Sequence, residues 1–157
     1  MRDLQELNMN EGGRPVDRPA PSDREIADYE THFGVQLPDE YVMLLRHANG
    51  GHPELDGFQP QGIVEEELWG VDRFYHLGGD KDDLGGLWGV TTQWQAAVGK
   101  NVVPVAHDPG GNQIMLEYDS SSPSVVMCLH DQRFRMISVA DSFSEFIDLL
   151  CEDPDMI

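Results

Sequence analysis

Residues 22–51, which read SDREIADYETHFGVQLPDEYVMLLRHANGG, carry the strongest structural signals in the chain. Ser22 followed three residues later by Glu25 is typical of a capping box, in which the two residues bond each other's backbone N–H groups at a helix start. Gly34 can adopt the left-handed conformation that ends a helix. Between these positions, apolar and aromatic residues recur at helical spacing, at Ile26, Tyr29 and Phe33. The pattern predicts a helix over residues 23–33.

A second helix is predicted in the same stretch. Pro38 suits the first helical turn, and the acids at Asp39 and Glu40 favour a helix N-terminus. Asn49 and Gly50 tolerate positive φ angles and therefore end the helix. Its apolar stripe comprises Leu37, Tyr41, Leu44, Leu45 and Ala48. Each of the two helices buries one face, so later parts of the chain must cover them.

The covering layer is predicted to be a sheet with further helices. Alternation predicts a strand over 71–77, and Pro104 suggests that the strand 102–106 is an edge or begins there. Further strands are expected over 113–118, 123–130 and 134–140, with helices over 84–98 and, after the capping box of Ser142 and Glu145, at the end of the chain. This order predicts an α+β fold, with a mixed or mainly antiparallel sheet packed with about four helices.

The 157 residues fit one domain. Residues 1–21 are predicted to be a loosely ordered leader, because Asn, Gly and three prolines interrupt any helix there. The domain is then expected over 22–157. No apolar run approaches the roughly 20 residues that span a bilayer, no secretory signal begins the chain, and two cysteines are too few for a disulfide framework. We therefore expect a cytoplasmic protein.

The net charge of the chain limits the classes of molecule that it can bind. The chain has 10 basic and 29 acidic side chains, a formal net charge of −19, which argues against nucleic-acid ligands and anionic membranes. It favours a basic protein partner, although acidity can also serve solubility alone. The acids peak over 52–90, where we predict a partner surface with Trp69 and Phe74 as apolar anchors. Its candidate residues are Glu65, Glu66, Glu67, Trp69, Asp72, Phe74, Asp80, Asp82 and Asp83.

Catalytic signatures are absent from the sequence. It contains no GxSxG, P-loop, GxGxxG or HExxH motif, and the six histidines are not spaced as metal ligands. Cys128 and His130 share one face of a predicted strand and could form a thiolate–imidazole pair, but a cysteine in an apolar strand is usually a core residue. We expect no catalytic residue, metal or cofactor, and therefore a binding protein, not an enzyme.

The predicted motifs together resemble the SUKH superfamily. The resemblance rests on the capped helix from Ser22 with Glu30 and Phe33-Gly34, on Leu37-Pro38-Asp39-Glu40-Tyr41, and on the terminal Asn49-Gly50-Gly51. It continues through the 103–112 hairpin and the 139–146 helix start, and covers about residues 21–151. The family includes a fungal cell-wall-assembly regulator and many bacterial immunity proteins. The resemblance implies an α+β fold and brings no catalytic residue with it.

In bacteria, the resemblance implies an antidote that binds a cognate toxin domain, often a nuclease or deaminase, and blocks it. A toxin that acts on nucleic acid needs a basic surface, which would complement the −19 charge of this chain. The alternative is a non-catalytic regulatory or scaffold protein that binds cellular partners. The sequence specifies neither the toxin nor an oligomeric state.

Overall fold

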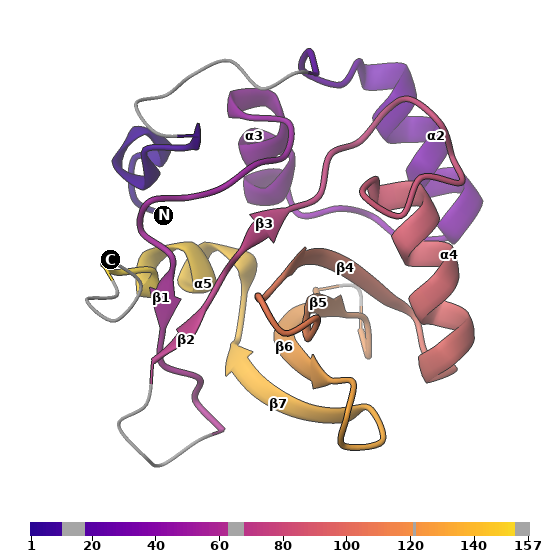
Figure 1. Cartoon of the computed structure of the whole chain (residues 1–157). Helices are drawn as coiled ribbons and strands as arrows, with labels where there is room; N and C mark the ends of the chain where they lie inside the picture. The colour runs from indigo at the N-terminus through magenta and orange to yellow at the C-terminus, as the bar shows by residue number, and fades with distance from the viewer. Residues whose placement is uncertain (11–17, 63–67, 121, 153–157) are drawn as a thin grey trace.

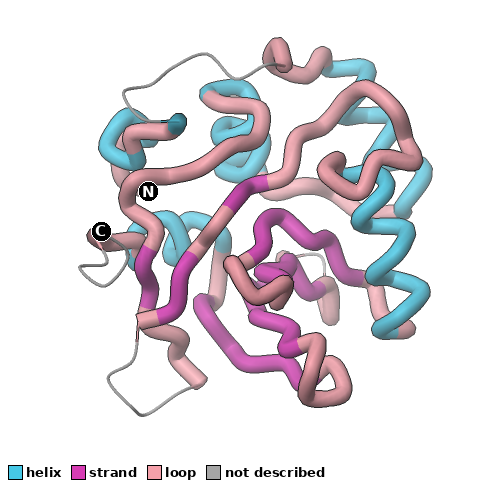
Figure 2. Tube along the Cα trace, in the orientation of Figure 1, coloured by secondary structure: helices cyan, strands magenta, loops and turns pink. Residues whose placement is uncertain are grey.

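A computed structural model describes residues 1–10, 18–62, 68–120 and 122–152. Within these ranges the chain has a short 3-10 helix and four α-helices, with two antiparallel sheets (Figures 1 and 2). The helices are η1 (Leu4–Leu7), α2 (Asp23–Phe33), α3 (Asp39–His47), α4 (Leu87–Val98) and α5 (Phe143–Leu149). The strands are β1 (Gly57–Phe58), β2 (Trp69–Gly70), β3 (Arg73–Phe74), β4 (Val102–His107), β5 (Gln113–Glu117), β6 (Ser124–Leu129) and β7 (Arg135–Ala140). The α+β expectation is confirmed.

The larger sheet is an antiparallel meander in the order β3-β4-β5-β6-β7, and β1 and β2 form a separate pair. Helix α4 packs against β4, whereas α5 packs against β6 and β7. Helix α2 lies outside α4, where the buried hydroxyls of Tyr29 and Thr91 are 2.7 Å apart (Figure 1). None of the helices in the described ranges is long and apolar enough to cross a bilayer.

The signals in residues 22–51 specify the helix ends correctly. Ser22 Oγ accepts the Glu25 N–H, the Glu25 carboxylate accepts the Ser22 N–H, and Gly34 ends α2 at φ 66°. Helix α3 begins after Pro38 and stops before Asn49, as predicted. The final helix differs in one detail, because the Glu145 carboxylate accepts the N–H of Asp141, the residue before the cap. Local capping chemistry thus fixes these boundaries.

The strand predicted over 71–77 is shorter than expected, and its alternation is wrong. Only Arg73–Phe74 is a strand, Arg73 is exposed, and residues 74–77 are all buried. The backbone here bonds several partners in turn: Val71 donates to Asp56, Phe74 to Gly51, and Tyr75 to Val105. Other parts of the chain cover both faces of this segment, so side chains that point in opposite directions are all buried. The alternation of buried and exposed residues expected for a strand is therefore absent.

The edge position predicted for the strand at Pro104 is also wrong. Strand β4 lies inside the sheet, between β3 and β5. Strand β3, however, pairs only with Ala106 and His107 and stops short of Pro104, where the register with β5 shifts. Proline has no N–H to give a ladder, and a bulge beyond the end of a short neighbour accommodates it.

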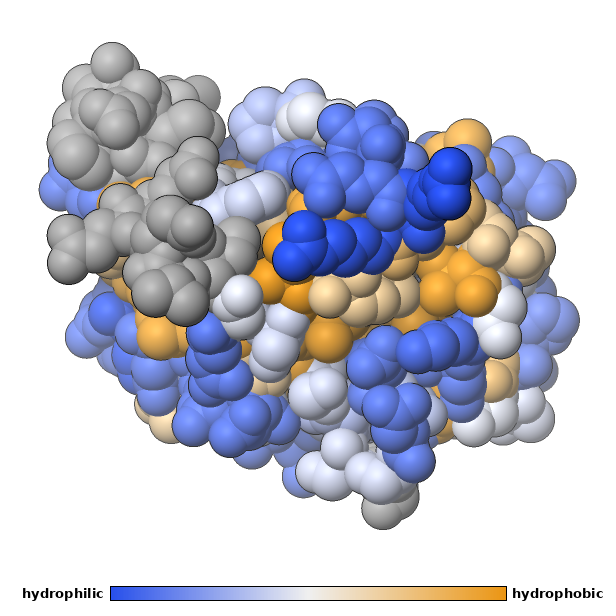
Figure 3. Space-filling view, turned by 90° about the horizontal axis from the view of Figure 1, so that it is seen from below, coloured by the Kyte–Doolittle hydropathy of each residue, from blue (hydrophilic) through white to orange (hydrophobic). Residues whose placement is uncertain are grey.

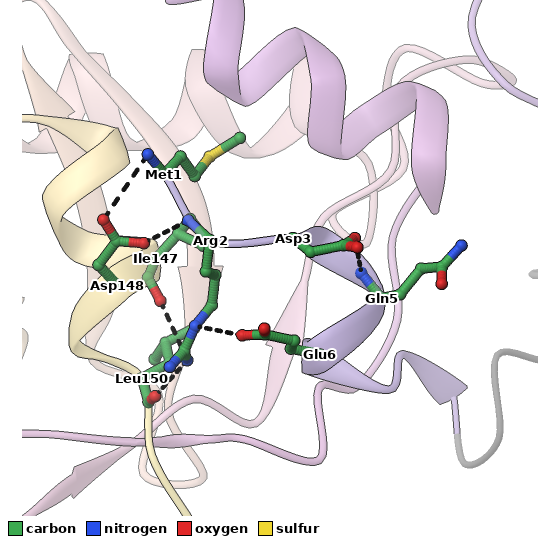
Figure 4. A network of polar contacts seen from close by, with 8 residues as sticks. All are labelled: Met1, Arg2, Asp3, Gln5, Glu6, Ile147, Asp148 and Leu150. Atoms are coloured by element: carbon green, nitrogen blue, oxygen red, sulfur yellow. Dashed lines mark hydrogen bonds and ion pairs between the residues drawn. The ribbon is translucent and has the colours of Figure 1, made fainter.

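Residues 1–10 pack against the core, although the sequence predicted a loosely ordered leader over 1–21. Leu7 and Met9 are buried, and Leu4 is nearly so. Arg2 donates from its guanidinium to the carbonyl of Leu150 at 2.5 Å, and from its backbone N–H to Asp148 (Figure 4). The apolar spacing of η1 was hidden by the glycines and prolines that follow it. Residues 11–17 lie outside the described residues, and the domain boundary at residue 22 stays a prediction.

We expect Leu7→Ala to lower the free energy of unfolding by about 2–5 kcal/mol, because it removes a fully buried side chain. Leu84→Ala is the matched control, since Leu84 is 57% exposed and its truncation should cost less than about 0.5 kcal/mol. Urea unfolding measures both. Equal stabilities for the two variants would mean that residues 1–10 do not contribute to the core.

Candidate functional site

The predicted acidic surface is divided in the structure. Trp69 and Asp72 lie by the β1–β2 pair, whereas the acids at 80, 82 and 83 lie in the loop that runs past α2 into α4 (Figures 1 and 2). We call residues 77–86 the acidic loop. Glu65, Glu66 and Glu67 lie outside the described residues. The six candidates that the structure describes therefore do not form one continuous patch.

Phe74 is not available as a surface anchor, which corrects the prediction. It is 2% exposed, and its ring centroid lies 6.5 Å from that of Phe146 in the core. Trp69 is half-buried and packs against the same core. Asp72 keeps 43% of its side chain exposed and lies 3.8 Å from His107 Nδ1. Near β3, one carboxylate and part of one indole therefore remain accessible from the predicted set.

The acidic loop is anchored by Asn49, the residue that follows the end of α3. Its amide oxygen accepts the Leu77 N–H at 2.8 Å, and its amide nitrogen donates to the carbonyls of Leu77 at 2.7 Å and Pro19 at 2.9 Å. At the other end of the loop, the N–H of Leu87 donates to the carbonyl of His76 at 2.7 Å. Both ends of the loop are thus fixed to the core.

Inside the loop, the carboxylates also organise the backbone. Asp80 accepts the N–H of Asp82 at 2.9 Å, and Asp83 accepts the N–H of Gly85 at 2.8 Å. Asp83 also lies 3.7 Å from the guanidinium of Arg18. Asp80 and Asp82 remain exposed to solvent. The loop therefore presents acidic side chains from a backbone that is held in place.

A small pocket lies between the acidic loop, α2 and the first turn of α4. Its polar lining includes Glu25 and Asp28 from α2 and Asp80 and Lys81 from the loop. Trp88 forms an apolar wall, and its ring packs edge-on against Tyr29 and Phe33 at 5.8 and 5.3 Å between centroids. We call this the Trp88 pocket. It combines negative charge with an aromatic surface, which are the two features predicted for the partner surface.

The sequence prediction missed Glu25, Asp28 and Trp88 in this site. Glu25 and Asp28 are one helical turn apart on the exposed side of α2, which the sequence pattern does specify. Their proximity to the acidic loop depends on a contact between residues about 50 positions apart in the chain. Trp88 lies among Gly85, Gly86 and Gly89, which weaken the helix signal at that point.

His76 lies beneath the acidic loop and is nearly buried. Its side chain is 8% exposed, and its Nε2 lies 3.7 Å from Asp83. Burial lowers the pKa of His76 from its usual value near 6.5, the positive charge of Arg18 lowers it further, and Asp83 acts in the opposite direction. The imidazole is therefore held neutral under the loop.

A second exposed aromatic surface has the opposite charge. Phe134, in the β6–β7 turn, is 38% exposed and contacts Trp94 edge-on at 5.6 Å, between the exposed arginines 133 and 135. Figure 3 looks onto the side of the molecule where β7 and this turn lie, and shows an apolar band bordered by hydrophilic side chains. Because arginines flank it, this surface suits a basic partner less well than the Trp88 pocket does.

Cys128 and His130 do not provide the thiolate–imidazole pair considered from the sequence. Burial raises the pKa of the Cys128 thiol to about 11, so the thiol stays protonated at neutral pH. The His130 ring bonds the carbonyl of Gly110 at 2.7 Å. In the described part of the chain, no three His, Cys, Asp or Glu side chains gather closely enough to hold a metal ion.

We expect Asn49→Ala to lower the free energy of unfolding by about 3 kcal/mol, because it leaves the buried N–H and C=O of Leu77 without partners. Asn101→Ala, at an exposed asparagine, should cost less than about 1 kcal/mol. Urea unfolding checks both values. Hydrogen exchange at Leu77 should quicken in Asn49→Ala alone, and unchanged exchange would refute the anchoring role.

The contribution of His76 to stability should fall as the pH is lowered from about 7.5 to about 5.5. Its folded-state pKa is lowered, so below about pH 6.5 the unfolded chain binds the proton more readily than the folded one. At higher pH both states are neutral and the effect vanishes. His76→Gln should flatten the pH dependence in urea unfolding, whereas His47→Gln, at an exposed histidine, should not. Identical slopes in both variants would contradict this assignment.

Comparison with known proteins identifies relatives of the whole fold. Residues 20–149 match the sequence model of the SMI1 / KNR4 family (SUKH-1). The chain is also 24% identical over 170 aligned residues to the SPbeta prophage-derived uncharacterized protein YokK of Bacillus subtilis (strain 168). That alignment covers 96% of this chain and 84% of the relative. The family match begins just before Ser22 and extends to the end of α5, so it includes α2, the acidic loop and Trp88.

Proposed function

Because the chain belongs to the SMI1 / KNR4 family (SUKH-1), a family that includes toxin immunity proteins, we propose that it is an immunity protein. It binds a cognate toxin domain in the cytoplasm of the bacterium that makes both, and blocks the toxin by covering its active surface. No bond is made or broken in this action. The toxin that we propose is basic and acts on nucleic acid, as a nuclease or a deaminase does.

The observation that carries this proposal is the Trp88 pocket with the acidic loop. A toxin that binds nucleic acid must present Lys and Arg to phosphates, and the same side chains are attracted by clustered carboxylates. With a net charge of −19, this chain attracts such a surface over long range and repels polyanions. Trp88 adds an aromatic contact of the kind that supplies binding energy at the centre of protein interfaces.

Occlusion explains how binding alone can neutralise a toxin. An acidic protein that docks on a nucleic-acid site occupies the cationic groups that the substrate would contact. Opposite charges also speed the encounter, which protects the cell before the toxin reaches its substrate. The anchored ends of the acidic loop support this role, because a surface that is already ordered loses less entropy on binding.

The test is co-expression with the toxin domain encoded beside this gene. Wild-type protein should restore growth, and so should a control with Asp119→Asn, Asp131→Asn and Glu152→Gln, three exposed acids away from the pocket. A variant with Asp28→Asn, Asp80→Asn and Asp82→Asn has the same net charge but should associate about tenfold more slowly. Surface plasmon resonance at low and physiological salt measures these rates.

Unchanged toxicity in the presence of wild-type protein would refute the immunity role. A pull-down that returns several unrelated cellular proteins and no toxin would instead favour the alternative of a regulatory or scaffold protein. Equal association rates for the two triple variants would keep the immunity role but move the binding surface away from the Trp88 pocket.

A further inference from the structure

The Trp88 pocket already holds a cation that belongs to the chain itself. The ammonium of Lys81 lies over the Trp88 ring, 4.3 Å from its centroid, in the range of a cation–π contact. Carboxylates of Glu25, Asp28 and Asp80 line the same pocket. Lys81 follows Asp80 directly, so the same loop brings a carboxylate and an ammonium to this pocket.

Two glycines of the acidic loop have positive φ angles that L side chains rarely adopt. Gly78 has a φ of 120°, and a Cβ there would lie 2.9 Å from the Glu25 carboxylate. Gly79 has a φ of 78°, and a Cβ there would lie 2.3 Å from a guanidinium nitrogen of Arg18. The loop thus brings its backbone within contact distance of charged side chains from other parts of the chain. Arg18 thereby lies 3.7 Å from Asp83, and Lys81 lies over the Trp88 ring.

A buried polar atom adjoins the pocket at the base of the acidic loop. His76 Nε2 is buried and has no hydrogen-bond partner among the described residues. It lies 3.7 Å from Asp83, which is beyond hydrogen-bond reach. Gly86, which lines the pocket, lies against the same nitrogen, since a Cβ there would be 3.3 Å from it. His76 thus lies behind the pocket wall and does not itself line the pocket.

We propose that the Trp88 pocket is the socket for one arginine of the partner protein, and that Lys81 occupies the socket until this arginine displaces it. A guanidinium can stack on the indole face while its five N–H groups reach the carboxylates of the pocket. An ammonium is a compact point charge without the planar face and the fixed fork of donors that make this combined contact specific. The proposal rests on the proposed function only for the existence of a basic protein partner.

The experiment removes the internal competitor and uses a short cationic probe. Lys81→Ala vacates the socket, whereas Arg135→Ala on β7 removes one positive charge from an exposed position away from the pocket. Both variants therefore have the same net charge. The probe is a capped hexa-arginine peptide, which is added stepwise to the protein. Binding is followed by the indole N–H signal of Trp88 in nuclear magnetic resonance spectra. This signal is assigned by its absence from the spectrum of Trp88→Phe.

Lys81→Ala should bind hexa-arginine about 2- to 5-fold more tightly than Arg135→Ala, which is the worth of one exposed cation–π contact. The affinity for hexa-lysine should rise less when Lys81 is replaced by alanine. Asp28→Asn should weaken binding of the probe relative to Asp131→Asn. Equal affinities of Lys81→Ala and Arg135→Ala, or a Trp88 signal that does not move, would overturn the socket.

The two proposals fail separately. If Lys81→Ala binds the peptide more tightly but the protein does not reduce toxicity, the socket stands and the immunity role falls. If the protein neutralises the toxin but Lys81→Ala and Arg135→Ala bind the toxin equally, the immunity role stands and the socket falls.

Discussion

The side-chain amide of Asn49 connects the end of α3 with the start of the acidic loop and with the segment that precedes α2. It lies where α3 ends, and its three hydrogen bonds hold both Leu77 and Pro19. Without these bonds, the start of the acidic loop would have no fixed position relative to α2, and the Trp88 pocket would lose one wall. A single residue at a helix end therefore links the helical hairpin, the loop and the site, and this is a reason for a buried asparagine in an otherwise apolar region.

Much of the fold was predictable because its signals are local. The capping box at Ser22, Gly34 after α2 and the turn after Asn49 each act within one helical turn of the boundary that they set. Strands β4, β5, β6 and β7 were expected close to their observed positions, because apolar runs there are separated by turn residues. Prediction was wrong where one segment meets several others, as at residues 71–77, and where Pro104 depends on the length of a neighbouring strand.

The site was only partly predictable for the same reason. Charge density along the chain drew attention to Asp80, Asp82 and Asp83, but it also selected Phe74, which the core buries. Sequence proximity to acids says nothing about which way a side chain faces in an irregular segment. Glu25, Asp28 and Trp88 come from helices that looked merely structural. Their role depends on tertiary packing of α2 against α4, which no window of sequence reports.

The bond between Arg2 and the carbonyl of Leu150 brings positions almost a whole chain apart within 2.5 Å, and Figure 1 shows α5 on the other side of the molecule from α2 and α4. Segments that adjoin in this way suit circular permutation, since a linker can join them while a new opening is cut in a surface turn. A force that pulls these two segments apart would first break the hydrogen bond between Arg2 and Leu150, next to α5. The five-stranded sheet would bear load only after that bond had broken.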